Sequence, residues 1–359
     1  MRRSKIAKLW GINVSGKRLK ESPVFLEDVN AILADTNIPW EKLRGARVLV
    51  TGATGMIGSV VVRVLSELNA RNGYGILIAA AGRSEEKGRA LERLQGVTFW
   101  PKDVREPFDA REPVDYILHC AAVTNSAKMV SDPAGVIGTE VLGARNVLEL
   151  ARAGGIKGMV YTSSMEVYGL LDKEEVFEED QGYIDLSNAR SCYPQSKRTA
   201  ENLCACYHAQ YGLPVSTVRL GMTFGAGCDI NDPRVWAQFA RSAIAGEDLI
   251  LRTEGKSVTS VLYLADAVSA LITALFSGGG TYNAAAASMT IREIAETVAG
   301  AYGVKVIVDK PADAAKLGYS GDFKLPLNTD RLKALGWRAR VSDVAEMFGL
   351  LVNDWEGQL

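Results

Sequence analysis

Hydrophobic and polar positions alternate in blocks along most of the chain, with short apolar runs between longer amphipathic stretches from Arg47 to about Val308. This alternation is typical of βαβ units and predicts a parallel sheet. Apolar runs without a polar break, such as ILIA and YIL, are expected where helices cover both faces of a sheet. We predict strands at Arg47–Thr51, Gly75–Ala81, Val97–Pro101, Val114–His119, Gly158–Ser163, Pro214–Leu220 and Ser260–Val261, and helices at Ile57–Asn69, Val136–Ala153 and Gln195–Tyr211.

The rest of the chain divides into an amino-terminal extension and a less regular carboxyl-terminal part. An amphipathic stretch, Phe25–Leu33, predicts a helix docked on the domain surface or against a second subunit. After about residue 220 we expect loops at Gly225–Arg234 and Arg252–Ser260, and helices at Ile291–Tyr302 and Val341–Trp355. The predicted fold is α/β: a helical extension (1–46), a doubly wound parallel sheet domain (47–220), and a smaller α/β substrate lobe interwoven with the main sheet (221–359).

A glycine-rich segment, TGATGMIG, follows the first predicted strand. Glycines with G-x-x-G-x-x-G spacing permit a tight turn, close approach of a pyrophosphate to backbone N–H groups, and tight packing of the helix on the strand. The amino terminus of the helix adds partial positive charge. The flanking strand and helix favour dinucleotide binding by a Rossmann domain over a merely structural glycine turn. The residues assigned to this cradle are Gly52, Thr54, Gly55, Met56, Ile57 and Gly58.

The end of the second predicted strand bears on which dinucleotide is bound. An acid normally follows this strand and binds the ribose hydroxyls of the adenosine. Here the strand continues into Arg83 and Ser84, which suit a 2′-phosphate and favour NADP. The alternative is that Arg83 stacks on adenine or faces solvent. Asp103, which precedes Val104 after the third strand, is expected to hold the adenine amine or to be an ordinary turn carboxylate.

Bulk properties exclude several classes of protein. The formal net charge of -1 provides no field that would attract nucleic acid or an anionic membrane. The apolar runs have the length of strands, so no membrane span is expected. With 5 cysteines and 2 histidines, the chain suits reduced thiols in the cytoplasm and is not expected to bind a metal.

Two segments carry side chains suited to hydride-transfer chemistry. Tyr193 and Lys197 are four residues apart, so they share one face of a helix that begins near Tyr193 with Pro194 at its first position. An ammonium beside a phenol favours the phenolate, which can take the proton of a substrate hydroxyl while the hydride leaves for a nicotinamide. Ser164 follows a predicted strand at the sheet edge where ligands bind, and would hydrogen-bond the same hydroxyl.

Together these motifs resemble the extended short-chain dehydrogenase/reductase family, the nucleotide-sugar epimerases and dehydratases. The resemblance implies a Rossmann domain that holds NAD or NADP, with Ala121, Ala122 and Lys197 among the contacts. It also implies a nucleoside-diphosphate sugar in the smaller lobe, oxidation at sugar C4, return of the hydride within the same turnover, and a homodimer. The matching segments span roughly residues 47–340 and are TGATGMIG, Asp103-Val104, His119-Cys120-Ala121-Ala122, Ser163-Ser164-x-x-Val167-Tyr168-Gly169, Tyr193-x-x-x-Lys197, Arg219 with Phe224-Gly225-Ala226-Gly227, Tyr263-x-x-Asp266-Ala267 and Leu335-Gly336-Trp337.

Two residues after Ser164 bear on which reaction of the family is expected. Glu166 stands where the dehydratases and decarboxylases of the family carry a glutamate, which in the dehydratases removes the C5 proton. The alternative for Glu166 is a carboxylate that only binds backbone or a neighbouring lysine. Met165 replaces the aspartate that serves glucose-type 4,6-dehydratases as the acid for water loss, and a thioether cannot donate that proton.

Other departures bear on how the substrate is held. Thr259 lies near the place where many relatives carry an arginine that binds the phosphates, for which Arg219 or Arg252 are candidate substitutes. Thr139-Glu140 stands where relatives often carry an asparagine that supports the active-site geometry. The residues that the resemblance places at the substrate are Thr124, Met165, Arg219 and Thr259.

The favoured function is an NAD(P)-dependent nucleotide-sugar epimerase or 4,6-dehydratase with hydride transfer at sugar C4, Tyr193 as base and Glu166 as candidate C5 base. The first alternative is an NADPH-dependent reductase or dehydrogenase of a non-nucleotide carbonyl or alcohol, which Arg83 and the missing arginine near Thr259 support. The second alternative is a non-catalytic dinucleotide-sensing protein, and the presence of both Tyr193 and Lys197 argues against it.

Overall fold

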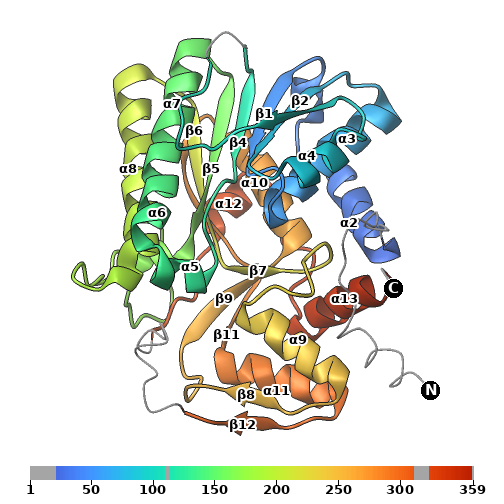
Figure 1. Cartoon of the computed structure of the whole chain (residues 1–359), viewed down its shortest axis with the longest axis vertical. Coiled ribbons are helices and arrows are strands. Elements are labelled where there is room, and N and C mark those ends of the chain that lie inside the picture. Colours follow the sequence, from blue (N-terminus) through green and yellow to red (C-terminus); the bar gives the residue numbers. More distant parts are fainter. Residues whose placement is uncertain (1–21, 110–112, 311–322, 358–359) are drawn as a thin grey trace.

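A parallel sheet with the strand order β10-β6-β5-β4-β1-β2-β3 dominates the computed structural model, which describes residues 22–109, 113–310 and 323–357 (Figure 1). The first strand lies inside the sheet and the chain winds outward from it in both directions, so the predicted Rossmann fold is confirmed. The strands of this sheet are β1 (Arg47–Thr51), β2 (Leu77–Gly82), β3 (Val97–Pro101), β4 (Tyr116–His119), β5 (Gly158–Ser164), β6 (Val215–Leu220) and β10 (Gly280–Ala284).

Helices cover both faces of this sheet. Helices α3 (Met56–Asn72) and α10 (Leu264–Leu275) pack on one face, and α7 (Gly143–Gly154) and α8 (Cys192–Tyr211) pack on the other. Neighbouring residues of β1 therefore enter different cores, and every one of its central positions is apolar. The remaining short elements of this part are η2 (Trp40–Leu43), α4 (Glu85–Leu91), α5 (Ser126–Ser131), α6 (Pro133–Ile137), η4 (Met165–Tyr168) and η5 (Ala189–Ser191).

The described part of the amino-terminal extension docks on its own chain. Helix α2 (Pro23–Leu33) begins after Ser22, whose Oγ accepts a hydrogen bond from the N–H of Phe25 at 3.1 Å. The helix packs against α3, α10 and α13 (Val344–Gly357). Asp28 on its inner face accepts a hydrogen bond from the Tyr263 hydroxyl at 2.6 Å and pairs with Arg340. Docking on the domain surface, one of the two predicted placements, is confirmed, and residues 1–21 lie outside the described residues.

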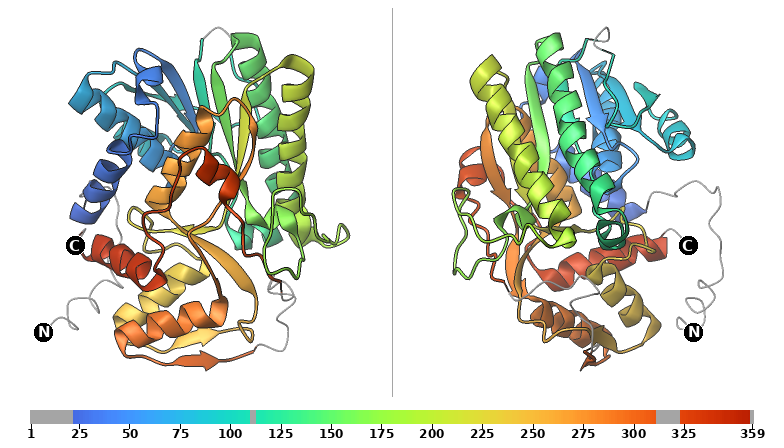
Figure 2. Two further views of the ribbon diagram at one scale, coloured as in Figure 1. Left: turned by 180° about the vertical axis from the view of Figure 1, so that it is seen from behind. Right: turned by 60° about the vertical axis from the view of Figure 1, so that its left-hand side comes forward.

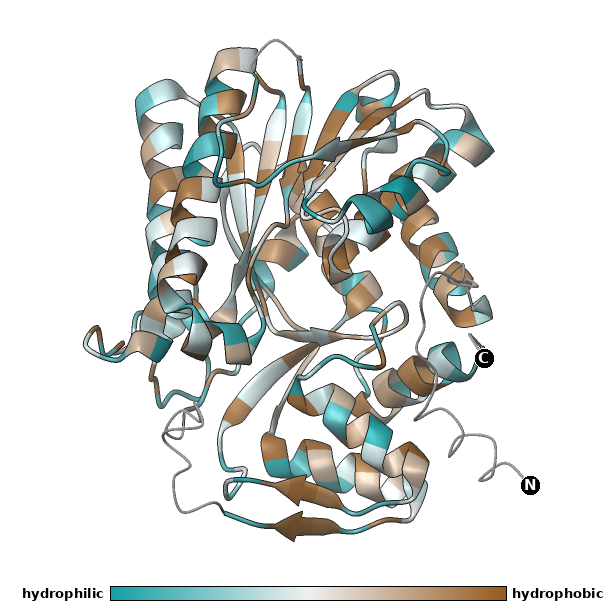
Figure 3. Ribbon diagram, viewed as in Figure 1, coloured by the Kyte–Doolittle hydropathy of each residue, from teal (hydrophilic) through white to brown (hydrophobic). Residues whose placement is uncertain are grey.

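The sequence after residue 220 builds a smaller lobe and then returns to the main sheet (Figure 2). In the lobe, β7 (Met222–Phe224), β9 (Val258–Tyr263) and β11 (Ala287–Thr290) form one sheet. The apolar strands β8 (Leu249–Leu251) and β12 (Val306–Val308) form another (Figure 3). The lobe also contains α9 (Val235–Ala245) and α11 (Ile291–Tyr302), whereas β10, α10 and α12 (Asp330–Ala334) belong with the main sheet. The predicted boundary at residue 220 stays a prediction.

Several predicted elements differ from the observed ones. The predicted helix Val136–Ala153 is interrupted by a wider π-helical turn, η3 (Gly138–Leu142). The predicted loop Arg252–Ser260 is wrong at its end, because β9 begins at Val258. Helix α8 begins at Cys192, so Pro194 is its third residue rather than its first. Proline is tolerated there because the first turn of a helix has no intrahelical acceptor for its N–H groups. Within the described ranges, no helix is both long and apolar enough to cross a membrane.

Candidate active site

The glycine-rich turn between β1 and α3 has the geometry of a phosphate cradle. Gly52 has a φ of +64°, and a Cβ there would lie 2.7 Å from the backbone of Ala121. A Cβ on Gly58 would lie 2.3 Å from the carbonyl oxygen of Gly52, so only glycine fits at either position. Gly55 caps α3 without a side chain to accept from the first N–H groups of the helix. These N–H groups, which include those of Met56 and Ile57, suit a pyrophosphate.

The adenosine end of the predicted cofactor site is more open. Arg83 follows β2 and is exposed, and the Ser84 hydroxyl caps α4 by accepting from the N–H of Lys87 at 3.4 Å. The carboxylate of Asp103 binds the guanidinium of Arg105 at 2.7 Å, and this contact lowers the pKa of Asp103. An adenine amine would have to share this carboxylate with Arg105.

Neighbouring cofactor candidates lie at the ends of β2 and β3 and in the loop after β4. Val104 is buried beside Gly143, and Thr54 lies against Gly82 at the end of β2. Ala121 and Ala122 are half-buried after β4, and the N–H of Ala121 donates to the Thr51 hydroxyl at 3.4 Å. The predicted cofactor residues therefore gather along the carboxyl edge of the sheet, with Arg83 at its exposed end.

Tyr193 and Lys197 lie in the first two turns of α8, on the side that packs against β5. The Lys197 ammonium donates a hydrogen bond to the Thr162 carbonyl at 2.8 Å. It lies 4.7 Å from the ring centre of Tyr161 and 5.8 Å from that of Tyr193. The structure therefore brings the predicted tyrosine and lysine together at the end of β5, where Ser164 also lies.

The turn that carries Ser164 and Glu166 is tied firmly to α8. The Ser164 hydroxyl accepts a hydrogen bond from the N–H of Glu166 at 3.2 Å. Arg198, which follows Lys197, donates to the carbonyls of Val167 at 2.5 Å and Tyr168 at 3.2 Å. These contacts fix Ser164 relative to α8.

Burial and nearby carboxylates govern the protonation of Tyr193. Burial raises the pKa of its phenol far above the ordinary value, and the charges of Glu140 and Glu166 raise it further. A hydrogen bond with Ser164 and the charge of Arg234 lower the pKa of Tyr193. A substrate hydroxyl and a bound cofactor would replace part of the protein surroundings that hold this phenol protonated.

Lys197 has a buried partner that the sequence analysis did not identify. Its ammonium lies 2.9 Å from the Glu140 carboxylate, and the side chains are 1% and 0% exposed. The sequence marks Thr139-Glu140 as a departure from the family pattern, but it does not show that Glu140 contacts Lys197. The available signal was a charged residue inside the apolar stretch VIGTEVL, because a buried charge requires a partner.

Glu166 also has a charged partner, but this pair is more exposed to solvent than the pair of Lys197 and Glu140. Both terminal nitrogens of Arg190 lie 3.4 Å from one Glu166 oxygen, and the Glu166 side chain is 39% exposed. Arg190 belongs to η5, directly before α8. The alternative interpretation of Glu166 expected a backbone group or a lysine as partner, and the residue found is an arginine.

The predicted substrate residues fall into different surroundings. Met165 and Thr259 are buried together, and the Thr259 hydroxyl donates to the Met165 sulfur at 3.6 Å. Thr124 is exposed in the loop after β4. Arg252 is exposed and pairs with Asp309.

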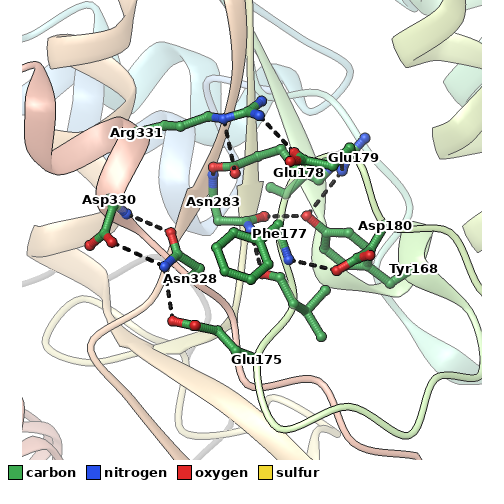
Figure 4. A network of polar contacts seen from close by, with 12 residues as sticks. Tyr168, Glu175, Phe177, Glu178, Glu179, Asp180, Asn283, Asn328, Asp330 and Arg331 are labelled. Atoms are coloured by element: carbon green, nitrogen blue, oxygen red, sulfur yellow. Dashed lines mark hydrogen bonds and ion pairs between the residues drawn. The ribbon is translucent and has the colours of Figure 1, made fainter.

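Arg219 lies in a polar network behind the turn that carries Ser164 and Glu166. It pairs with Glu201 at 2.6 Å and donates to the Tyr168 hydroxyl at 3.0 Å and the Glu178 carbonyl at 2.6 Å. The Tyr168 hydroxyl donates in turn to Asn283 at 2.6 Å, and Glu178 lies beside Arg331 in the same network (Figure 4). Because Arg219 is engaged on all three nitrogens, binding substrate phosphates would require some of these contacts to break.

Arg234 is a further site residue that sequence reasoning missed. Its guanidinium pairs with Asp232 at 2.6 Å and donates to the Met56 sulfur at 3.0 Å. Its charge also acts on Tyr193. Arg234 thus lies between the start of α3 and Tyr193. The sequence placed it only at the end of a loop, and no local signal indicated this position.

A doubly wound sheet with a glycine-rich strand-to-helix turn, and with a tyrosine–lysine pair at its carboxyl edge, defines a dinucleotide-dependent enzyme. The profile of the NAD dependent epimerase/dehydratase family matches residues 48–285. The chain belongs to this family, which confirms the resemblance drawn from its motifs.

Proteins similar to this chain include a decarboxylase, an epimerase and a dehydratase of nucleotide sugars. UDP-glucuronic acid decarboxylase 3 of Arabidopsis thaliana is 30% identical over 322 residues, which cover 87% of this chain and 90% of the relative. A crystal structure of Thermus thermophilus UDP-glucose 4-epimerase in complex with NAD is 28% identical, with a TM-score of 0.70, and covers 87% of this chain and 100% of that one. A dTDP-glucose 4,6-dehydratase from Streptomyces venezuelae shares the fold at 22% identity and a TM-score of 0.71, covering 86% of this chain and 97% of that one.

Proposed function

We propose that this enzyme transiently oxidises C4 of a nucleoside-diphosphate sugar, and that its substrate is a UDP-hexuronic acid which it decarboxylates. The observation that carries the proposal is the catalytic turn itself. Ser164 and Glu166 lie beside Tyr193, while Met165 between them is a buried thioether. A reaction that expels hydroxide would require an acid at this place, whereas loss of carbon dioxide requires none.

The steps balance with the residues at hand. Tyr193, as phenolate, takes the proton of the C4 hydroxyl as the C4 hydride leaves. NAD, when bound, supplies the hydride acceptor and later the donor. The C4 ketone makes the C5 carboxylate a β-keto acid, so the C5–carboxylate bond breaks, carbon dioxide leaves, and its electron pair forms an enolate. Glu166 or water protonates C5, the hydride returns to C4, and Tyr193 returns its proton to the oxygen.

Two further observations support a uronic acid. The guanidinium of Arg190 is half-buried beside Glu166 and offers positive charge to a sugar carboxylate. The relative in Arabidopsis thaliana that matches 87% of this chain is a UDP-glucuronic acid decarboxylase.

C4 epimerisation is the second candidate, because it also requires no acid at Met165. The Thermus thermophilus UDP-glucose 4-epimerase, 28% identical over 87% of this chain, favours it. In that reaction the hydride returns to the opposite face of C4 and C5 keeps its substituents.

The test uses purified enzyme with NAD and UDP-glucuronic acid carrying carbon-13 in its carboxylate. Release of labelled carbon dioxide, observed by NMR and lost in Tyr193→Phe, is the expected result. Conversion to the C4 epimer with retention of the label would show that the activity is epimerisation and not decarboxylation. Formation of a 4-keto-6-deoxy sugar from UDP-glucose or dTDP-glucose would contradict both versions.

For the cofactor, we propose NAD over NADP. Arg83 is exposed and Ser84 already caps α4, so neither is preorganised around a 2′-phosphate. Calorimetric titration with both dinucleotides tests this, and tighter binding of NADP that is lost in Arg83→Ala would overturn it.

We also propose that the enzyme is a cytoplasmic homodimer. Val130, Ile137 and Leu142 are 52%, 46% and 46% exposed on the helices next to α8, and such residues suit a subunit contact. Light scattering should give a dimer for the wild type and a monomer for Leu142→Asp. A monomeric wild-type protein would contradict this proposal.

A further inference from the structure

Glu140 lies at the one irregular turn of the helical segment that faces α8. The π-helical turn η3 separates α6 from α7 and carries Glu140 into the interior, where its side chain is 0% exposed. Insertions of this kind place a side chain that a regular helix would direct elsewhere, and they are frequent at functional sites. Here the insertion places a carboxylate behind the catalytic lysine.

The Glu140 carboxylate joins three parts of the site. One oxygen lies 2.9 Å from the Lys197 ammonium, and the other accepts from the N–H of Val123 at 3.0 Å. The Tyr161 hydroxyl lies 3.5 Å from the first oxygen. The carboxylate therefore connects α8 to β5 and to the loop after β4, which contains the predicted cofactor and substrate residues Ala121, Ala122 and Thr124.

The charge of Glu140 changes what Lys197 does to the phenol. A lone ammonium beside a phenol favours the phenolate, whereas the opposite charge of a paired carboxylate offsets much of that effect at the phenol. Burial and then Glu140 raise the pKa of Tyr193. The other charged and titratable groups that act on Tyr193 or on its neighbours Lys197, Cys192 and Glu166 are Lys197 and Cys192 on α8, Tyr161 on β5, Glu166 on η4, Arg190 on η5, His119 on β4 and Arg234 before α9.

We propose that Glu140 is a positioning residue that holds the Lys197 ammonium, neutralises its charge, and thereby sets the pH at which Tyr193 becomes a base. The proposal rests on the role given to Tyr193 in hydride transfer, but it does not depend on which sugar is the substrate. The proposal also accounts for the glutamate where relatives often carry an asparagine, since an asparagine amide would leave the ammonium charge uncompensated.

The test measures the titration of Tyr193 without substrate, in the enzyme loaded with NAD. Tyrosinate absorbance is followed against pH, and subtraction of the same curve for Tyr193→Phe isolates this residue. In Glu140→Gln, likewise corrected with the double variant, we expect Tyr193 to titrate about one pH unit or more lower, which is roughly tenfold more tyrosinate at a given pH. Glu140→Asp keeps the charge and should stay near the wild-type curve.

Glu201→Gln is the matched control. It removes a partly buried carboxylate from α8 that pairs with Arg219 rather than Lys197, and should leave the Tyr193 titration in place. The proposal would be overturned if Tyr193 titrated equally in the wild type and in Glu140→Gln. The same conclusion would follow if neither protein formed tyrosinate up to about pH 10. If Glu140→Gln does not fold, Glu140→Asn takes its place under the same criterion. A shifted titration without turnover of UDP-glucuronic acid would reject the proposed substrate and keep the role of Glu140.

Discussion

The two carboxylates that flank Tyr193 occupy opposite environments. On the inner side, Glu140 is 0% exposed and lies 2.9 Å from Lys197. On the outer side, Glu166 is 39% exposed and lies 3.4 Å from Arg190. The inner pair has backbone and tyrosine contacts around it, whereas the outer pair faces the region in which a substrate would bind.

This difference separates fixed charge from chemistry that can change during turnover. A buried pair holds its charges in place, because removing either partner leaves the other uncompensated in a low dielectric. An exposed pair is weakly coupled, so its carboxylate can exchange its partner or take up a proton. We therefore assign the electrostatic setting of Tyr193 to Glu140 and proton transfer at the sugar to Glu166.

The largest expected effect is on the inner pair. Lys197→Met should lower the free energy of unfolding by about 3 to 5 kcal/mol, because the Glu140 carboxylate is left buried without its cation. Urea unfolding measures this loss. The double variant Lys197→Met with Glu140→Gln should recover most of it, and a loss below about 1 kcal/mol in the single variant would show that the pair is not held as charges.

The inner side also predicts a loss of stability in acid. Burial, and then the charge of Lys197, lowers the pKa of His119 from 6.5 to about 3. As the pH falls below 6.5, the unfolded chain binds a proton at this histidine and the folded protein does not, so stability present above 6.5 is lost. At two units below 6.5 the loss is about 2.7 kcal/mol.

Urea unfolding of the wild type and of His119→Gln at neutral pH and near pH 4.5 isolates this contribution. The variant should lose less stability on acidification than the wild type. Equal losses in the two proteins would mean that His119 is protonated in the folded state.

The features proposed to hold the cofactor could be predicted because their signals are local. The glycine turn and the spacing between Tyr193 and Lys197 can each be read within a few residues, and β1 and β3 have the predicted bounds. Helix α10 was not predicted, since it is apolar over most of its length and buried on all sides, and a short apolar run does not distinguish a buried helix from a buried strand. Strand β10, with the sequence GTYNA, carries too little apolar pattern to be recognised alone.

The pairings of charged residues could not be predicted for a different reason. Lys197 and Glu140 are far apart in the sequence, and their contact depends on the π-helical turn η3, which no propensity indicates. The pairing of Arg190 with Glu166 depends in the same way on how η5 leads into α8. Sequence patterns pointed to the side chains proposed for catalysis, while their electrostatic environment required the three-dimensional structure.

The outer carboxylate should matter for chemistry and little for folding. Glu166→Gln should reduce the rate of deuterium incorporation at sugar C5 by about a hundredfold, in line with the loss of a general acid or base, while the C4 hydride step persists. An NMR time course of product formation in heavy water measures this rate. The unfolding free energy should change by less than about 1 kcal/mol, and undiminished incorporation would remove Glu166 from the reaction.

The smallest expected effect is the coupling within the outer pair. A double-mutant cycle of Arg190→Gln and Glu166→Gln, read out as free energy of unfolding, should give an interaction energy of about 0.2 to 1 kcal/mol. The same cycle on Lys197 and Glu140 should give several times more, since both of those side chains are buried. Similar coupling energies in the two cycles would mean that burial does not distinguish the two sides of Tyr193. The assignment of fixed charge to one carboxylate and proton transfer to the other would then have to be abandoned.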